Sequence, residues 1–130
     1  ADLGLGPNAT APGTPQEFTV TVGDRIYFDT DSSAIRADAQ QTLARQAQWL
    51  AKYPTYAVTI EGHADERGTR EYNLALGDRR ARAARNYLLS LGITADRLRT
   101  VSYGKERPIA LGSNEQAWAR NRRAVTIVLN

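Results

Sequence analysis

The sequence predicts an α/β fold of the α+β sandwich type, a mixed β-sheet with helices packed on one face. Segments rich in β-branched residues alternate with segments of helical periodicity, in the expected order β-β-α-β-α-β-α-β. Helices between strands act as crossovers that permit parallel strand pairs beside antiparallel ones. The chain has 130 residues and 42% hydrophobic residues, which is enough for one hydrophobic core.

The beginning of the chain differs in composition from the rest. Residues 1–16 are small, polar and rich in Gly and Pro, so we expect a flexible N-terminal tether there and a folded domain over residues 17–130. Apolar and polar residues alternate in the segment EFTVTV, residues 17–22, which predicts a first short strand. A second strand is expected at residues 25–30, ending in an acidic loop.

The remaining elements follow from periodicity and from their stop signals. Tyr53-Pro54 ends the first long helical pattern and Gly92 ends the second. Helices are expected at 34–53, 70–91 and 115–121, and strands at 56–62, 97–104 and 124–130.

The second long helix is rich in arginine, and its helical angles separate the arginines from one another. With Ala81 as the centre of the core-facing side, a stripe within about 60° of it is expected to be buried. The stripe consists of Leu74, Gly77, Ala84 and Leu88. Arg80 falls on one shoulder with Asn73, Leu76 and Tyr87, whereas Arg79 points away from the core.

The shoulder that carries Arg80 meets the loop that contains Asp65. A helix N-terminus and a guanidinium group both favour a bound carboxylate, and an aspartate can hold an ammonium group. The spacing therefore suggests a receptor for a zwitterion. On the residues alone, two alternatives remain open: a charged helix that is simply solvated, and a nucleic-acid-binding surface.

Four ordered blocks carry a resemblance to a known family. They are IYFDTDSSAIRADAQ, IEGHADERGTREYNLALGDRRARAARNYLLSLG, VSYGKERPI and NRRAVTIVL. Together they resemble the OmpA-like peptidoglycan-binding domain over about residues 18–130. The resemblance implies an OmpA-like mixed sheet. It also implies that the ligand is meso-diaminopimelate in the stem peptide of peptidoglycan, and the free end of diaminopimelate is a zwitterion.

The resemblance also implies roles for individual residues. Asp65 matches the acid that binds the ammonium group, and Arg80 matches the arginine that binds the carboxylate. Further contacts are implied for Thr30, Asp31, Asn73, Leu76 and Arg67. Family members often carry an aromatic residue where Thr30 stands, so we expect a more open pocket wall on that side.

The branch of the family with the most similar sequence implies partners and a location. They are TolB, the other components of the Tol envelope system and the outer membrane, on its periplasmic face. The chain has no cysteine, so an N-terminal lipid anchor would need a residue ahead of Ala1. The resemblance implies binding without catalysis, and no cofactor is expected. A metal site is not expected either, because His63 is the sole histidine.

A polyanion-binding module is the alternative function. The 17 basic and 14 acidic residues give a net charge of +3, which is too mild to demand nucleic acid as a partner. The evidence for this alternative is the arginine-rich helix together with the NRR segment, residues 121–123. Steep loss of affinity with salt would distinguish such a module from a zwitterion site. We expect no nucleic-acid partner.

Overall fold

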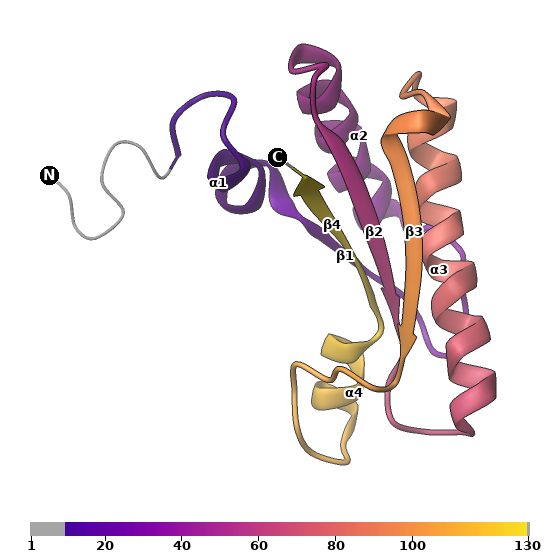
Figure 1. Ribbon diagram of the computed structural model, residues 1–130. Helices are drawn as coiled ribbons and strands as arrows, with labels where there is room; N and C mark the ends of the chain where they lie inside the picture. The colour runs from indigo at the N-terminus through magenta and orange to yellow at the C-terminus, as the bar shows by residue number, and fades with distance from the viewer. Residues whose placement is uncertain (1–9, 130) are drawn as a thin grey trace, which may run out of the picture.

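The computed structural model describes residues 10–129 and places all the expected helices and strands except the first strand (Figure 1). Described strands and helices agree with the predicted segments within a few residues at each end. The strands are β1 (Arg25–Tyr27), β2 (Ala57–His63), β3 (Leu98–Gly104) and β4 (Arg123–Leu129), and the larger helices are α2 (Ala37–Lys52), α3 (Arg70–Ser90) and α4 (Glu115–Asn121). A single 3-10 turn, Ala95–Arg97, precedes β3.

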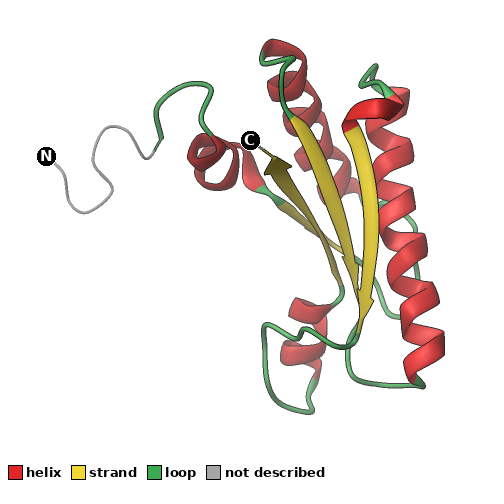
Figure 2. Ribbon diagram, viewed as in Figure 1, coloured by secondary structure: helices red, strands yellow, loops and turns green. Residues whose placement is uncertain are grey.

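The four strands form one mixed sheet in the order β1-β4-β2-β3. The central strand β2 runs parallel to β3 and antiparallel to β4, and β4 runs antiparallel to β1. Helices α2 and α3 lie on the same side of this sheet, whereas α4 lies beyond one end of it (Figure 2). The predicted fold class, a mixed sheet with helices on one face, is confirmed.

The core lies between the two long helices and the sheet. Val58 and Ile60 project from β2 toward the helices and are fully buried. They meet Leu43 and Leu50 of α2 and Leu88 of α3, each 1% exposed or less. Burying side chains of this size contributes about 1.5–3 kcal/mol each, so this layer provides much of the stability of the domain.

Two glycines allow α3 to approach the sheet closely. A methyl group on Gly62 of β2 would collide with the carbonyl of Gly77 in α3, and one on Gly77 would lie 2.9 Å from the carbonyl oxygen of Gly62. The expectation that Gly77 permits close packing is therefore confirmed. The close contact fixes the height of α3 above the strand end from which the Asp65 loop begins.

The prediction of a first strand at residues 17–22 is wrong, because this segment is helical. It forms α1 (Pro15–Glu17) and a π-helical turn, Phe18–Gly23. The side chain of Thr14 caps α1, and Pro15 occupies its first turn, where its missing N–H costs nothing. Helical geometry buries Phe18 completely while leaving Val20 58% exposed, so the alternation of apolar residues does not reflect a half-buried strand.

The described part of the expected tether, residues 10–16, is attached to the domain, while residues 1–9 lie outside the described residues. Trp49 of α2 donates a 2.6 Å hydrogen bond from Nε1 to Oε1 of Glu17, and Tyr56 donates one of 2.6 Å to the carbonyl of Gly13. The ring of Phe18 meets Trp49 edge-on at 5.1 Å. These contacts define an N-terminal latch of Gly13, Glu17, Phe18, Trp49 and Tyr56.

The buried side of α3 differs from the expected stripe at the start of the helix. Ala81, Gly77, Ala84 and Leu88 are buried as expected, but Leu74 is 40% exposed, so its assignment to the stripe is wrong. Asn73, Leu76 and Arg80 are buried instead. The first turn of α3 lies against the end of β3, where Ser102 donates to the carbonyl of Leu74, while Asn73 and Arg80 face the loops and donate to the carbonyls of Arg67 and Ser32. None of the helices within residues 10–129 has the length and apolar character needed to cross a membrane.

Candidate ligand-binding site

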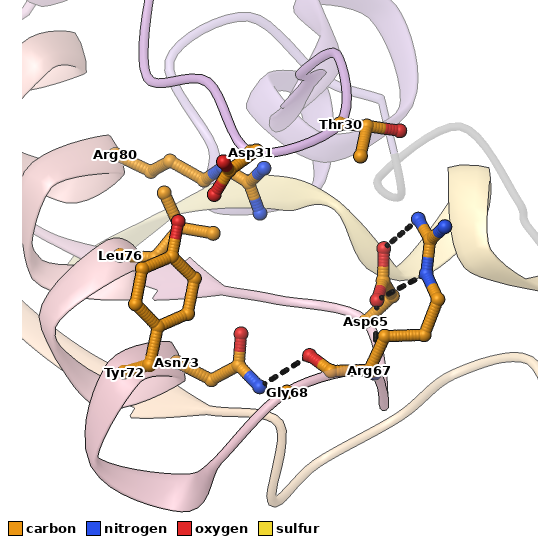
Figure 3. Close-up of a pocket in the computed structure, with 9 residues that line it drawn as sticks. All are labelled: Thr30, Asp31, Asp65, Arg67, Gly68, Tyr72, Asn73, Leu76 and Arg80. Atoms are coloured by element: carbon orange, nitrogen blue, oxygen red, sulfur yellow. Dashed lines mark hydrogen bonds and ion pairs between the residues drawn. The ribbon is translucent and has the colours of Figure 1, made fainter.

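A pocket of about 270 Å³ opens where the loops after β1 and β2 meet the first turns of α3 (Figure 3). All seven residues predicted for the site line it. The complete lining consists of Thr30, Asp31, Asp65, Arg67, Gly68, Tyr72, Asn73, Leu76 and Arg80. Gly68 and Tyr72 were not predicted, although both belong to the GTREY segment that leads into α3. The structure thus brings two distant loops together at one end of the sheet.

The start of α3 is fixed by side chains that cap it and hold the preceding loop. The hydroxyl of Thr69 accepts a 3.0 Å hydrogen bond from the backbone N–H of Tyr72, which is the usual role of an N-cap threonine. Asn73, only 2% exposed, donates from Nδ2 to the carbonyl of Arg67 at 2.8 Å. The loop and the positive end of the helix dipole therefore form one side of the pocket.

Arg80 is fully buried and connects three segments of the chain. Its guanidinium donates to the carbonyls of Ser32 (2.9 Å), His63 (2.9 Å) and Asp29 (3.0 Å). Burial lowers the pKa of Arg80 to about 10, although the charges of Asp65 and Asp31 oppose this shift, so Arg80 stays charged at neutral pH. Three of the five N–H groups of an arginine are used in this way, which leaves two for another acceptor.

Asp65 is buried and already paired with Arg67. Nε of Arg67 donates to Oδ1 at 3.1 Å, its Nη2 to Oδ2 at 2.9 Å, and its backbone N–H to Oδ1 at 3.0 Å. Burial alone would raise the pKa of Asp65, but the hydrogen bonds and charge of Arg67 lower it below its ordinary value. Asp65 is therefore an anion at neutral pH, in a pocket that also contains the cation Arg80.

The NRR segment, which we considered as evidence for nucleic-acid binding, is part of the interior. Asn121, Arg122 and Arg123 are all 5% exposed or less. Arg122 donates from Nε to the carbonyl of Phe28 at 2.9 Å and from Nη2 to Glu115 at 2.8 Å, and its Nη1 lies 3.7 Å from Oδ2 of Asp65. Arg123 donates to the carbonyls of Asn121 and Arg107, so both arginines are used inside the domain and the segment offers no surface for a polyanion. The sequence alone gave no signal that Arg122 lies beside Asp65.

The loop after β1 contributes Thr30 and Asp31, and both residues are exposed. Asp31 has a φ of 57°, in the left-handed region that costs non-glycine residues about 1–2 kcal/mol. This conformation is more accessible to aspartate than to most residues, and such positions cluster at binding sites. Asp31 thus provides a second carboxylate at the pocket, closer to solvent than Asp65.

His63 lies directly before the Asp65 loop and is 1% exposed. Its Nε2 lies 3.1 Å from Oε1 of Glu61, and its ring stacks on that of Tyr103 at 5.6 Å. Burial and the charge of Arg123 lower the pKa of His63 to about 4, against the opposing effect of Glu61. His63 is therefore neutral at physiological pH, and its carbonyl rather than its ring serves the site.

The fold and the position of the pocket agree with the comparison with protein families. The model of the OmpA family matches residues 27–122. The chain belongs to the OmpA family. The matched range begins in β1 and includes every residue of the pocket lining.

Similar proteins narrow this assignment. The peptidoglycan-associated lipoprotein of Rhizobium meliloti is 67% identical to this chain, over 98% of this chain and 73% of that protein. The peptidoglycan-associated lipoprotein of Brucella melitensis is 65% identical, over 98% of this chain and 76% of that protein. The crystal structure of the peptidoglycan-associated lipoprotein from Burkholderia pseudomallei is 42% identical, with a TM-score of 0.81 over 92% of this chain and 97% of that chain. The C-terminal domain of Helicobacter pylori MotB shares the fold at 24% identity, with a TM-score of 0.76 over 82% of this chain and 84% of that chain.

Proposed function

We propose that this domain binds peptidoglycan non-covalently through the free end of meso-diaminopimelate in the stem peptide. It is a binding domain and not an enzyme, and it links the outer membrane to the cell wall as part of a Tol-Pal system. Membership in the OmpA family and the high identity to proteins named for their association with peptidoglycan support the coarser part of this proposal, peptidoglycan binding. The recognition of diaminopimelate is supported by the pocket.

The single observation that carries the proposal is the pairing of opposite charges in one pocket. Arg80 contributes a charged guanidinium to the lining, and Asp65 and Asp31 provide carboxylates in the same lining. A diaminopimelate carboxylate fits the guanidinium and the positive end of α3, and its ammonium fits an aspartate. Because Arg80 is fully buried in the free protein, we expect the exposed loop 29–33 to shift when the ligand enters.

The proposed cellular setting follows from the relatives. A lipoprotein anchor ahead of the described chain would hold the domain at the periplasmic face of the outer membrane, and the pocket would hold the wall. In Figure 1 α1 and the pocket loops lie at opposite ends of the sheet, which suits a link between two layers. Many weak attachments to a polymer also reinforce one another through effective concentration.

Calorimetric titration of the chain with a diaminopimelate-containing muropeptide tests the ligand. A matched muropeptide with lysine in place of diaminopimelate lacks the distal carboxylate and should bind at least about tenfold more weakly, because one charge-assisted contact is lost. Asp65→Asn should also weaken binding, whereas Asp78→Asn, in an exposed pair with Arg82, should not. Equal binding of both muropeptides would refute recognition of diaminopimelate.

TolB is the proposed protein partner, together with the other Tol-Pal components. Purified TolB titrated against the chain tests this part separately, because it needs no peptidoglycan. Measurable binding of TolB that is altered by the muropeptide would place the two sites in contact. A lack of any TolB binding would contradict the Tol-Pal assignment while leaving peptidoglycan binding standing.

A further inference from the structure

Asp65, the carboxylate proposed to bind the ligand's ammonium, already forms an ion pair with Arg67 in the free protein. Arg67 pairs with both oxygens of Asp65, at 3.1 Å from Nε and 2.9 Å from Nη2. This two-pronged geometry is the strongest arrangement that an arginine and a carboxylate can form. In Figure 3 the Arg67 guanidinium lies beside Asp65, on the side away from Arg80 and Tyr72, and both Asp65 and Arg67 line the pocket.

The position of Arg67 is supported by Trp118 rather than by burial. Its guanidinium carbon lies 4.0 Å from the centre of the Trp118 ring, within the range of a favourable cation–π contact. Trp118 is itself oriented by a 2.9 Å hydrogen bond from its Nε1 to Glu66. The Arg67 side chain remains 39% exposed, so it can leave Asp65 without unpacking the core.

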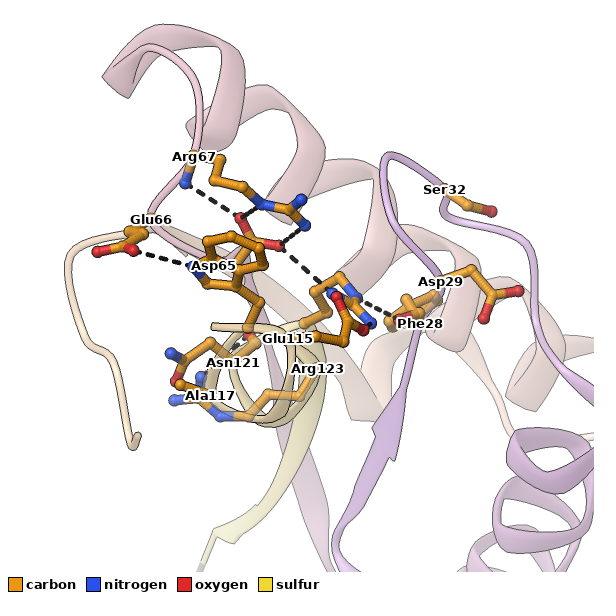
Figure 4. A network of polar contacts seen from close by, with 12 residues as sticks. Phe28, Asp29, Ser32, Asp65, Glu66, Arg67, Glu115, Ala117, Asn121 and Arg123 are labelled. Atoms are coloured by element: carbon orange, nitrogen blue, oxygen red, sulfur yellow. Dashed lines mark hydrogen bonds and ion pairs between the residues drawn. The ribbon is translucent and has the colours of Figure 1, made fainter. Parts of the chain in front are cut away.

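Arg122, the second cation near Asp65, has no such freedom. Its side chain is 7% exposed and is held by the carbonyl of Phe28 and by Glu115, while its Nη1 lies 3.7 Å from Asp65 (Figure 4). If the Arg67 side chain moved away, Asp65 would keep this longer contact and the 3.0 Å hydrogen bond from the backbone N–H of Arg67. Both carboxylate oxygens of Asp65 could then accept hydrogen bonds from a new cation. Such binding would be favourable, because a buried carboxylate is unfavourable without partners.

We propose that Arg67 is an internal substitute for the ligand's ammonium at Asp65, and that the ligand displaces it on binding. This inference rests on the proposed function. The competition makes the site selective, because a ligand with a neutral group at that position gains too little to replace a bidentate ion pair. Ligands with an ammonium group replace one cation by another, and Arg67 remains near Trp118 and the acidic residues Glu66 and Glu115.

Paired titrations test this competition. The muropeptide with a free diaminopimelate amine is compared with the same muropeptide after acetylation of that amine, using the wild-type chain, Arg67→Gln and Arg70→Gln. Arg70 is a matched control, since it is an exposed arginine that pairs with Glu106 at 3.4 Å and does not line the pocket. Binding of the free amine to Arg67→Gln should be about 2- to 5-fold tighter than to wild type, the range expected for removing one partly exposed competing pair. Arg70→Gln should match wild type.

The outcomes separate the competition from the proposed function. Weaker binding of the free amine to Arg67→Gln would show that Arg67 contacts the ligand directly and would overturn the inference. Unchanged binding would overturn it as well, because the ammonium would then sit elsewhere, with Asp31 as the nearest candidate. Loss of binding to every variant and to wild type would instead reject the proposed function.

A measurement on the free protein tests the pairing independently of any muropeptide. The carboxyl carbon of Asp65, followed by NMR during a pH titration, should report a higher pKa in Arg67→Gln than in wild type, because burial then acts with fewer opposing hydrogen bonds. Adding methylammonium chloride should shift the Asp65 signal more in Arg67→Gln than in wild type. Equal responses of the two proteins would contradict the substitution of Arg67 for an ammonium.

Discussion

Arg80 donates a 2.9 Å hydrogen bond from Nη1 to the main-chain carbonyl of His63, at the end of the central strand β2. The same guanidinium reaches across to the loop after β1, where it meets the carbonyls of Asp29 and Ser32. The cation of the proposed site is therefore also the connector that holds the two loops of the pocket in register. Loss of Arg80 would consequently alter the pocket and the stability of the domain together.

Arg80→Lys should destabilise the domain by about 3 kcal/mol or more, although the charge is kept. A lysine ammonium has no planar fork and leaves at least one of the three carbonyls without its charged donor. Urea unfolding followed by circular dichroism measures the loss. The exposed Arg79→Lys is the matched control and should change the free energy of unfolding by no more than about 0.5 kcal/mol. Equal stability of the two variants would contradict the connecting role of Arg80.

Gly77→Ala should also destabilise the domain, although alanine is the better helix former. The added methyl group collides with Ser102 and approaches the carbonyl of Gly62, so α3 has to move away from β2. Such overpacking costs typically about 1–3 kcal/mol, which exceeds the propensity gain of about 1 kcal/mol in most cases. Thermal unfolding compared with Asn86→Ala, at an exposed position of the same helix, measures the effect. A Gly77→Ala protein as stable as wild type would contradict the close contact.

Trp49→Phe should loosen the N-terminal latch. The variant removes the indole N–H that donates to Glu17 at 2.6 Å, and a hydrogen bond to a charged group contributes about 1.5–3 kcal/mol. Hydrogen exchange of residues 13–23 should become faster, while exchange in β2 should change less. Gln48→Ala, on the exposed side of α2, is the control. Unchanged protection in the Trp49→Phe variant would show that the aromatic packing alone holds the segment.

The buried His63 should make stability depend on pH between about 6.5 and 4. The folded-state pKa of His63 is lowered to about 4 from its ordinary value of 6.5, so the unfolded chain binds more protons within this window. Stability therefore falls as the pH falls from about 6.5 to about 4, by up to about 3 kcal/mol at 1.36 kcal/mol per pKa unit. Chemical unfolding at a series of pH values measures this slope. His63→Gln should flatten it, and an unchanged slope would assign the effect to other groups.

The sequence predicted most of the fold because the long elements repeat their signals many times. Helix α3 carries apolar residues at helical spacing over 21 residues and ends near Gly92, and β2 is a β-branched run that ends at a glycine. The segment at residues 17–22 offered only three apolar residues in alternation, a pattern that a short helical turn can also contain. Packing of Phe18 against Trp49, a contact over 31 positions of sequence, decided between the two, and no local pattern records such a contact.

The sequence also predicted that Asp65 and Arg80 lie near each other, because the end of a strand, the loop that follows it and the first turns of a helix are neighbours in the chain. Thr30 and Asp31, from a distant loop, were predicted by the family resemblance alone. Only the tertiary structure decided what those residues do in the free protein. Spacing placed Arg80 on one shoulder of its helix, but its burial depends on the loop after β1, about 50 positions away. The pairing of Asp65 with Arg67 and the burial of Arg122 likewise depend on rotamers and on α4. Periodicity describes the directions of side chains, whereas burial and charge pairing arise from what lies opposite them.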